Sequence, residues 1–169
     1  MGKLVQVATN TVTSAVASVT LTGIDSDDVY MVAYQNVIPS TDSSGFRFRV
    51  TVSGTADTSA NYDNANKQLA SDTTFANNYG ANATEFGILT LGTSGNESTN
   101  GILYLYNFNS SSEYSFVNIE TTDRNTNGSL RGSQGGGVHT VTQACDGLEF
   151  FFSNSSNFAS GVFTMYKVL

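Results

Sequence analysis

The sequence predicts an all-β protein built as an antiparallel β-sandwich, and three observations carry this prediction. Ser, Thr, Asn and Gly are abundant; most of them are poor helix formers, and Thr favours strands. Charged residues make up 12% of the chain, about half the usual share of roughly 25%, so long helices would lack a charged face. Short runs of alternating apolar residues recur between Gly- and Asn-rich turns. This pattern predicts about eight to ten short strands, with a jelly-roll-like topology.

The length and the aromatic content indicate a folded chain with one core. A chain of 169 residues suits a single domain over 1–169 and buries roughly 70% of its unfolded surface. The 11 Phe and 8 Tyr lie in regular alternating runs, which disordered chains lack. We therefore expect a core that forms without a metal or a disulfide.

The first third of the chain contains the strongest strand patterns. Residues 5–7 and 12–21 predict the opening strands, with a kink between two sheets at Ser14. Residues 23–28 form a predicted turn. Residues 29–37 are apolar on both faces, which is typical of a central or covered strand.

Residues 46–52 show the clearest alternation in the sequence. One face of this strand is expected in the core and the other outside it. The inward set is Phe46, Phe48, Val50 and Val52, and the outward set is Arg47, Arg49 and Thr51.

Two polar segments, 53–83 and 123–137, interrupt the second part of the chain. Both are predicted to be loops, the first with a short helix around 64–70, and loops this long are often functional. The remaining strands are expected at 86–91, 101–108, 114–122, 138–144, 148–153 and 158–168.

Charge and hydropathy exclude several classes of partner. The net charge of −7 opposes binding to nucleic acid or to an anionic membrane, which requires clustered Lys and Arg. No run of about 18 apolar residues occurs, and the N-terminus lacks the apolar stretch of a signal peptide. We expect synthesis in a cytoplasm, with export only inside an assembly.

No pattern typical of catalysis or of a cofactor occurs, so we expect neither. His139 and Cys145 would face the same way on one straight strand but lie about 20 Å apart, and we expect a surface histidine and a buried thiol. The segment 132–137 lacks the lysine and the helix of a phosphate-binding loop. The acids Glu85, Glu113, Glu120 and Asp123 carry no local signature of a glycosidase, and Trp is absent.

An acidic turn holds Asp25, Asp27 and Asp28. Clustered oxygen ligands suit Ca²⁺, but the spacing of a known calcium loop is missing. An Asp- and Ser-rich turn needs no ion. The sequence leaves open whether Asp25–Asp28 binds calcium.

Aromatic side chains are the best candidates for contacts with a partner. Strands 29–37 and 101–108 are apolar on both faces, which indicates that their tyrosines lie in an oligomer interface. The equally weighted alternative is that these tyrosines are core residues whose hydroxyls lie at the rim of the core. The loop 53–83 adds aromatics that would stack on a glycan or anchor a neighbour. The candidate contact residues are Tyr30, Tyr34, Tyr62, Phe75, Tyr79, Tyr104 and Tyr106.

Three stretches together resemble the β-sandwich modules of virion proteins from marine tailed phages, especially cyanophages. They are 12–24, 28–34 and the closing Gly161-Val162-Phe163-Thr164-Met165-Tyr166-Lys167-Val168. Such modules open with a Thr/Ser/Val strand and close on an aromatic one. The closing strand departs from them in reading Met165-Tyr166-Lys167 where they often have Leu-Tyr-Gly. The resemblance implies a homo-oligomeric part of a virion with no catalytic residues.

The leading hypothesis is a non-enzymatic structural protein on the virion surface, as a capsid decoration, knob or head-fibre component. A tail-fibre or tail-tip module that binds a host-surface glycan during attachment is the first alternative. A carbohydrate-binding or glycan-hydrolysing domain is the second. The expected assembly is a homo-oligomer, with a trimer favoured, in contact with other virion proteins.

Overall fold

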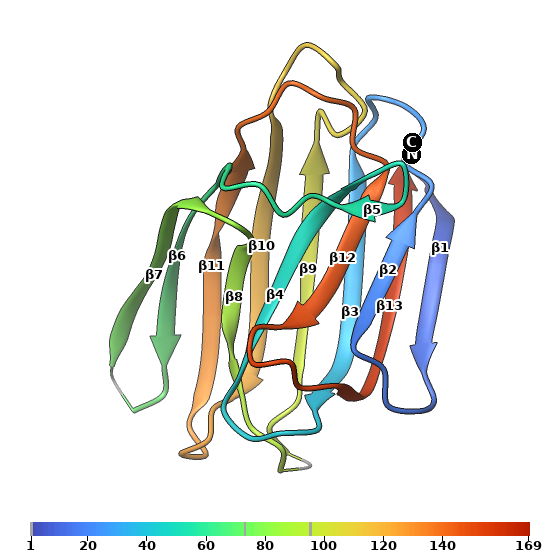
Figure 1. Cartoon of the computed structure of the whole chain (residues 1–169). Coiled ribbons are helices and arrows are strands. Elements are labelled where there is room, and N and C mark those ends of the chain that lie inside the picture. Colours follow the sequence, from blue (N-terminus) through green and yellow to red (C-terminus); the bar gives the residue numbers. More distant parts are fainter. Residues whose placement is uncertain (1, 73, 95) are drawn as a thin grey trace.

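The computed structural model describes residues 2–72, 74–94 and 96–169, and these residues form strands and loops without a helix (Figure 1). Thirteen strands are present in the described residues, more than the eight to ten expected. They are β1 (Leu4–Val12), β2 (Ser18–Thr22), β3 (Tyr30–Pro39), β4 (Ser44–Val52), β5 (Thr55–Ala56), β6 (Tyr62–Ala70), β7 (Phe75–Ala83), β8 (Phe86–Leu91), β9 (Thr99–Tyr106), β10 (Ser115–Arg124), β11 (Leu130–His139), β12 (Gly147–Phe152) and β13 (Phe158–Val168).

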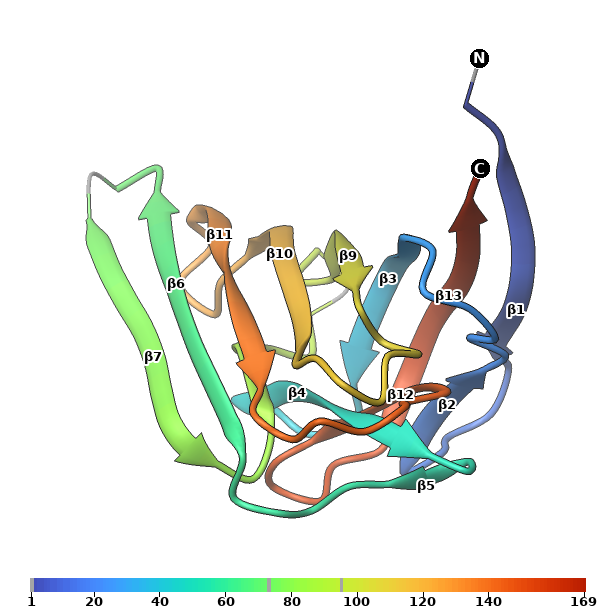
Figure 2. The same ribbon diagram turned by 90° about the horizontal axis from the view of Figure 1, so that it is seen from above.

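The strands form two antiparallel sheets, which confirms the all-β, sandwich-like architecture. The larger sheet has eight strands in the order β1-β13-β3-β9-β10-β11-β6-β7. The smaller sheet has the order β2-β12-β4-β5, and β8 also pairs with β4. The larger sheet curves around the smaller one (Figure 2). In the described part of the chain, no helix is long and apolar enough to cross a membrane.

The pairing of the strands is nested along the sequence. β1 pairs with β13, β2 with β12, β3 with β9 and β4 with β8. The chain is therefore one long antiparallel hairpin that is rolled up so that successive strands alternate between the two sheets. The strand pairs β6–β7 and β10–β11 are added to this frame and lengthen the larger sheet at one end.

Side-chain alternation on β4 follows the prediction. Phe46, Phe48 and Val50 are fully buried, and Val52 packs against the same core. Arg47 and Arg49 point away from it and are partly exposed. Thr51, the third residue predicted outside the core, is instead fully buried, and its hydroxyl donates to Asp146 (2.7 Å). The kink at Ser14 is also confirmed, because it falls in the link between β1 of the larger sheet and β2 of the smaller one.

The two predicted loops are wrong, because both polar segments are mainly strand. Segment 53–83 contains β5, β6 and β7, with no helix at 64–70, and segment 123–137 contains the end of β10 and most of β11. Apart from Tyr62, the buried side chains of these two segments are polar, so the apolar alternation that marks a strand is missing. They are Asn64, Asn66, Asp123 and Ser133. Glycine is required on β11, because a Cβ on Gly137 would lie 2.6 Å from the Phe86 ring.

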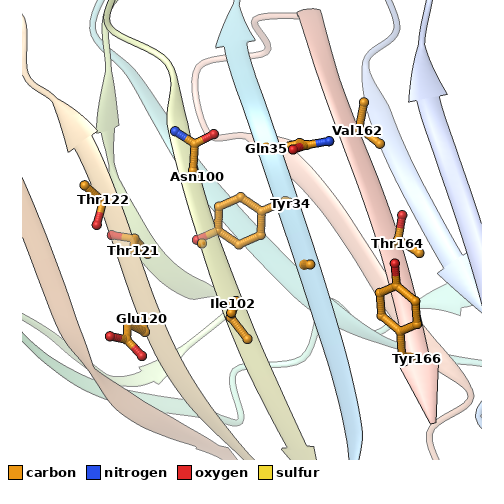
Figure 3. A pocket seen from close by; sticks show the side chains of 12 residues that line it. Tyr34, Gln35, Asn100, Ile102, Glu120, Thr121, Thr122, Val162, Thr164 and Tyr166 are labelled. Atoms are coloured by element: carbon orange, nitrogen blue, oxygen red, sulfur yellow. The ribbon is translucent and has the colours of Figure 1, made fainter. Parts of the chain in front are cut away.

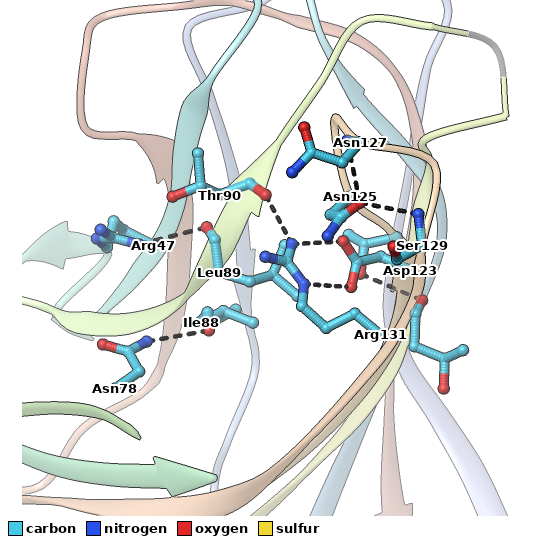
Figure 4. A network of polar contacts seen from close by, with 12 residues as sticks. Arg47, Asn78, Ile88, Leu89, Thr90, Asp123, Asn125, Asn127, Ser129 and Arg131 are labelled. Atoms are coloured by element: carbon cyan, nitrogen blue, oxygen red, sulfur yellow. Dashed lines mark hydrogen bonds and ion pairs between the residues drawn. The ribbon is translucent and has the colours of Figure 1, made fainter. Parts of the chain in front are cut away.

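Polar side chains of the larger sheet and of β4 cover the open edge of β8. Asn66 donates to the carbonyl of Gly87 (3.1 Å), Asn78 to that of Ile88 (3.1 Å), Arg47 to that of Leu89 (3.4 Å) and Arg131 to that of Thr90 (2.7 Å). Figure 4 shows the last three of these bonds. Unpaired carbonyls at a sheet edge invite pairing with another chain. The added strands thus satisfy the edge of the smaller sheet.

Candidate functional site

The outer face of the larger sheet, defined as the face turned away from the smaller sheet, carries the best candidate site. On β3, the core side chains Val32 and Tyr34 alternate with Ala33 and Gln35, which are directed outward. On β9, the buried Leu103 likewise alternates with outward residues. The strand register places the outward residues of β13, β3, β9 and β10 in adjacent cross-strand rows.

These rows enclose a shallow groove of about 550 Å³ (Figure 3). The groove is deepest at Ala33, because this small side chain lies between the larger Thr164 and Ile102 in one cross-strand row. The row beside it pairs Asn100 with Thr122. The outward side chains around the groove are Gln35, Asn100, Ile102, Glu120, Thr122, Val162, Thr164 and Tyr166.

A second depression of about 300 Å³ continues the groove across β9, β10 and β11. The two depressions share Ile102 and Glu120, which are directly paired across β9 and β10. Gln134 on β11 donates to the Glu120 carboxylate (3.2 Å) and holds it at this junction. The site is therefore a trough that runs across the strands, and most of its lining residues have uncharged polar side chains.

Tyr104, one of the predicted contact residues, lies beside this trough. It is 37% exposed and lines the second depression. Tyr106 is also on the outer face, partly exposed, and pairs with Phe116, which is 45% exposed. The structure thus brings Tyr104 and Tyr106 together on one accessible face.

The structure corrects the prediction for three other tyrosines, because Tyr30, Tyr34 and Tyr62 are core residues with at most 2% exposure. The Tyr30 hydroxyl donates to Asp25 (2.8 Å), and that of Tyr62 donates to the backbone carbonyl of Asp57 (2.6 Å). Burial raises the pKa of Tyr34, whose hydroxyl has no hydrogen-bond partner among the described residues. In this arrangement none of the three is accessible to a glycan or a neighbouring subunit.

Phe75 and Tyr79, expected on a loop, lie on β7 at one edge of the larger sheet. They are 66% and 79% exposed, the highest values among the large hydrophobic side chains of the described residues. They are remote from the trough, which ends at β11, two strands away. The structure therefore separates the predicted contact residues into a buried group, an outer-face group and an edge pair.

Lys167 balances part of the charge of the acidic turn. Nζ of Lys167 lies 2.8 Å from Asp28 and 3.5 Å from Asp25. A hydrogen bond from Tyr30, followed by the Lys167 charge, lowers the pKa of Asp25, and Lys167 lowers that of Asp28. The described residues contain no cluster of three or more His, Cys, Asp or Glu that would hold a metal. The Lys167 ammonium group thus contacts two of the three carboxylates of this turn.

The four candidate acids are dispersed. Glu85 pairs with Arg49, and Asp123 is buried with Arg131. Glu113 lies in an exposed loop, and Glu120 alone faces the trough. No two of them line the trough together.

His139 was predicted at the surface, but it is fully buried. Its Nε2 lies 3.1 Å from Oδ2 of Asp57, yet neither ring nitrogen has a partner with hydrogen-bond geometry among the described residues. The strand ends at His139, so the straight strand expected to hold both His139 and Cys145 is also wrong. Ser115 pairs with His139 across β10 and β11 and donates to Sγ of Cys145 (3.8 Å). Burial raises the pKa of Cys145 to about 11, so the thiol is a poor nucleophile.

We expect the stability of the protein to fall below pH 6.5 because of His139. Burial lowers the pKa of His139 below 6.5, and the nearby Asp57 carboxylate only partly opposes this shift. Between the lowered pKa and 6.5 the unfolded chain binds a proton that the folded protein excludes. The free energy of unfolding therefore decreases as the pH falls through this window, by at most about 1.4 kcal/mol per pH unit.

Denaturant unfolding at pH 7.5 and 5.5 measures this effect. The His139→Gln variant removes the titrating group and should show a smaller loss of stability between the two pH values. Equal losses in both proteins would contradict the assignment.

Sequence reasoning missed most residues of the trough. Gln35, Asn100, Thr122 and Thr164 are isolated polar positions on four strands, and nothing in their local spacing marks them as a group. Alternation along each strand could have identified its outward residues. Only the strand order, however, shows which outward residues of different strands are neighbours. Comparison of the chain with family models, with curated proteins and with solved structures finds no match.

Proposed function

We propose that this chain is a non-enzymatic surface protein of a phage virion and that its trough binds a saccharide. The observation that carries the proposal is the trough across β13, β3, β9, β10 and β11. A binding role at an open sheet face needs no cofactor and no lid. The groove volume of about 550 Å³ lies within the range of roughly 300–1,000 Å³ for small-molecule sites.

The chemistry of the lining suits a sugar. Gln35 offers an amide donor and acceptor, and the Thr122 hydroxyl can donate and accept. Asn100 offers its amide N–H groups, because its Oδ1 accepts from the Asn36 N–H (3.0 Å), and the Thr164 hydroxyl keeps part of its capacity beside its bond to Thr9 (3.0 Å). Ile102 provides an apolar surface for the C–H groups of a pyranose ring. Sugars present donors and acceptors around such an apolar ring face, so the two sets of groups are complementary.

The charges of the trough favour a neutral ligand and binding over hydrolysis. Glu120 is the one carboxylate among the described lining residues, and no Lys or Arg accompanies it. Glycosidases of both stereochemical classes use two carboxyl groups, about 5–10 Å apart. A single carboxylate held by Gln134 supports sugar binding through hydrogen bonds.

The virion part of the proposal is supported by the strand order and by the resemblance of the opening and closing strands to phage modules. We infer that β1-β13-β3-β9 and β2-β12-β4-β8 form a jelly roll, because four nested antiparallel pairs alternate between two sheets. Jelly rolls occur in viral capsid and lectin domains. This support is by analogy of fold, and absence of the chain from purified particles would refute it.

Truncating polar groups of the groove should weaken saccharide binding. A glycan array identifies a ligand, and calorimetry then compares the wild type with the double variant Gln35→Ala/Thr122→Ala. We expect affinity to fall about five-fold to a hundred-fold, since each of the two lost hydrogen bonds contributes about 0.5–1.5 kcal/mol.

The matched control is Asn127→Ala/Thr126→Ala, which removes an amide and a hydroxyl from an exposed turn outside the trough. This control should bind like the wild type. Equal affinities for all three proteins, or binding to no glycan, would reject the trough as the site.

A further inference from the structure

The edge strand β7 is the most exposed strand of the larger sheet. It ends the strand order, and among the described residues it pairs only with β6 (Figure 2). Its outward side chains include Phe75 and Tyr79, which are 66% and 79% exposed. These two exposed aromatic rings lie outside the trough, so saccharide binding there does not explain their exposure.

The backbone of β7 offers a straight row of free donors and acceptors. Ala70 donates to the carbonyl of Thr74 (3.1 Å), and ladder bonds alternate along an antiparallel pair. Ala76 and Asn78 therefore face β6, whereas the N–H and C=O groups of Phe75, Asn77 and Tyr79 face the open edge. A strand that pairs here would satisfy all of these groups.

The edges at β8 and at β1 carry features that oppose pairing, whereas residues 75–79 of β7 carry none of them. Side chains from β4, β6, β7 and β11 cover the carbonyls of β8. The edge strand β1 carries a bulge between Gln6 and Ala8, a feature that discourages edge-to-edge pairing. β7 has no charged residue and no proline, and its irregularity lies opposite Tyr62 and Asn64, beyond the straight run 75–79.

We propose that β7 pairs antiparallel with β7 of a second copy of this chain, around a two-fold axis at Asn77. In this register Phe75 of each copy is directly opposite Tyr79 of the other. The three residues with free backbone groups then form three hydrogen-bonded pairs. The irregular end of β7 remains outside the paired segment in each copy. The larger sheets of the two copies then form one continuous sheet.

The side chains on the outer face are complementary in this arrangement. Leu69, 46% exposed, pairs with Phe75 within one copy, and Ala65 pairs with Tyr79. Each end of the contact therefore forms a row of Leu69, Phe75, Tyr79 of the second copy and Ala65 of the second copy. Aromatic pairs directly across two strands are among the stabilising contacts of sheets.

Charge does not oppose this contact. Lys67 donates to Oδ1 of Asn77 (3.0 Å) and lies one strand in from the edge. Three strand spacings of about 4.8 Å separate the two Lys67 backbones, roughly 14 Å, which exceeds the Debye length of about 8 Å in physiological salt. The two-fold axis gives an even number of subunits instead of the trimer expected from the sequence.

Opposite charges introduced at the two paired positions test the register. Phe75→Lys and Tyr79→Glu should each convert the wild-type dimer to monomer in analytical ultracentrifugation. An equimolar mixture should recover a heterodimer, because the introduced lysine and glutamate face each other at one end while the native aromatic pair remains at the other. Thr11→Lys, an equivalent change on the opposite edge strand β1, should leave the dimer intact.

Cysteine cross-linking tests the position of the axis. Asn77→Cys places two thiols opposite each other with Cα atoms about 5.5 Å apart, which suits a disulfide, whereas Ala81→Cys lies off the axis. Under mild oxidation only the first variant should form a covalent dimer, since native Cys145 is buried.

Several results would overturn the proposal. They are a wild type that is monomeric at high concentration, dissociation by Thr11→Lys, no association in the mixture, or cross-linking at 81 without cross-linking at 77. Dissociation by Thr11→Lys would indicate pairing of β7 with β1 instead. Glycan binding by the trough is measured separately, so either proposal can fail alone.

Discussion

Replacement of Phe46 by alanine is expected to lower the free energy of unfolding by about 3–5 kcal/mol. Phe46 is fully buried on β4. Its ring lies 5.4–6.5 Å, between centroids, from five other rings of both sheets, those of Tyr34, Phe150, Phe152, Phe158 and Phe163. The alanine would leave a cavity where the two sheets meet, and surrounding rings held by their own contacts cannot fill it.

Chemical denaturation of the wild type and the variant measures this loss. Phe116→Ala is the matched control, since it removes the same ring from a site that is 45% exposed on the outer face. We expect the control to cost less than about 1.5 kcal/mol, because little apolar surface returns to water. Similar losses for both variants would contradict the role of Phe46 as the centre of the core.

Removal of the Asp123 carboxylate is expected to destabilise the protein by about 3–5 kcal/mol, because it leaves the Arg131 charge without a partner. Nε of Arg131 donates to Oδ1 of Asp123 (3.0 Å), and Nη2 donates to Oδ2 (2.5 Å) and to the carbonyl of Thr90 (2.7 Å) (Figure 4). The Asp123 side chain is 0% exposed and that of Arg131 is 13% exposed. The pair thus links β10 and β11 to β8 of the smaller sheet.

Desolvation makes the isolated charges of this pair unfavourable. Burial raises the pKa of Asp123, even though the Arg131 guanidinium opposes this shift. Asp123→Leu should therefore be severely destabilising, while Asp123→Leu/Arg131→Met should recover at least half of the loss. Urea unfolding of both variants distinguishes an uncompensated charge from a simple packing defect.

The control for the ion pair is Glu85→Gln. It removes the carboxylate of the Arg49–Glu85 pair, whose side chains are 20% and 24% exposed and 3.3 Å apart. Solvent screens such a pair, and we expect a change below about 1 kcal/mol. A double variant of Asp123 and Arg131 as unstable as Asp123→Leu alone would show that the ion pair does not explain the effect.

The strands with strict apolar alternation were predictable from local sequence. On β4 the spacing of Phe46, Phe48 and Val50 assigned both the strand and its buried face, and β3, β9 and β10 were located within about two residues. In contrast, β6, β7 and β11 were read as loops. Their inward positions include Asn66 and Asn78, which donate to the carbonyls of Gly87 and Ile88, and glycines such as Gly137, whose neighbours leave no room for a side chain.

The functional residues divide in the same way. Tyr34 and Tyr104 both lie on strands with two apolar faces, and no local pattern tells which face each strand turns inward. The structure buries Tyr34 and exposes Tyr104, because the smaller sheet covers one face of the larger sheet only. The trough and the exposed edge of β7 depend on strand order in the same manner.

The sequence by itself determined the all-β class, the sandwich-like architecture and the burial of the β4 aromatics, because alternation within one strand is a local property. Only the tertiary structure decided which strands are neighbours, since pairs such as β1–β13 join residues that are far apart in the chain. It therefore decided which polar side chains meet in the trough, why Asp57 and His139 are close, and which edge remains open. These features are set by long-range pairing, which no single segment encodes.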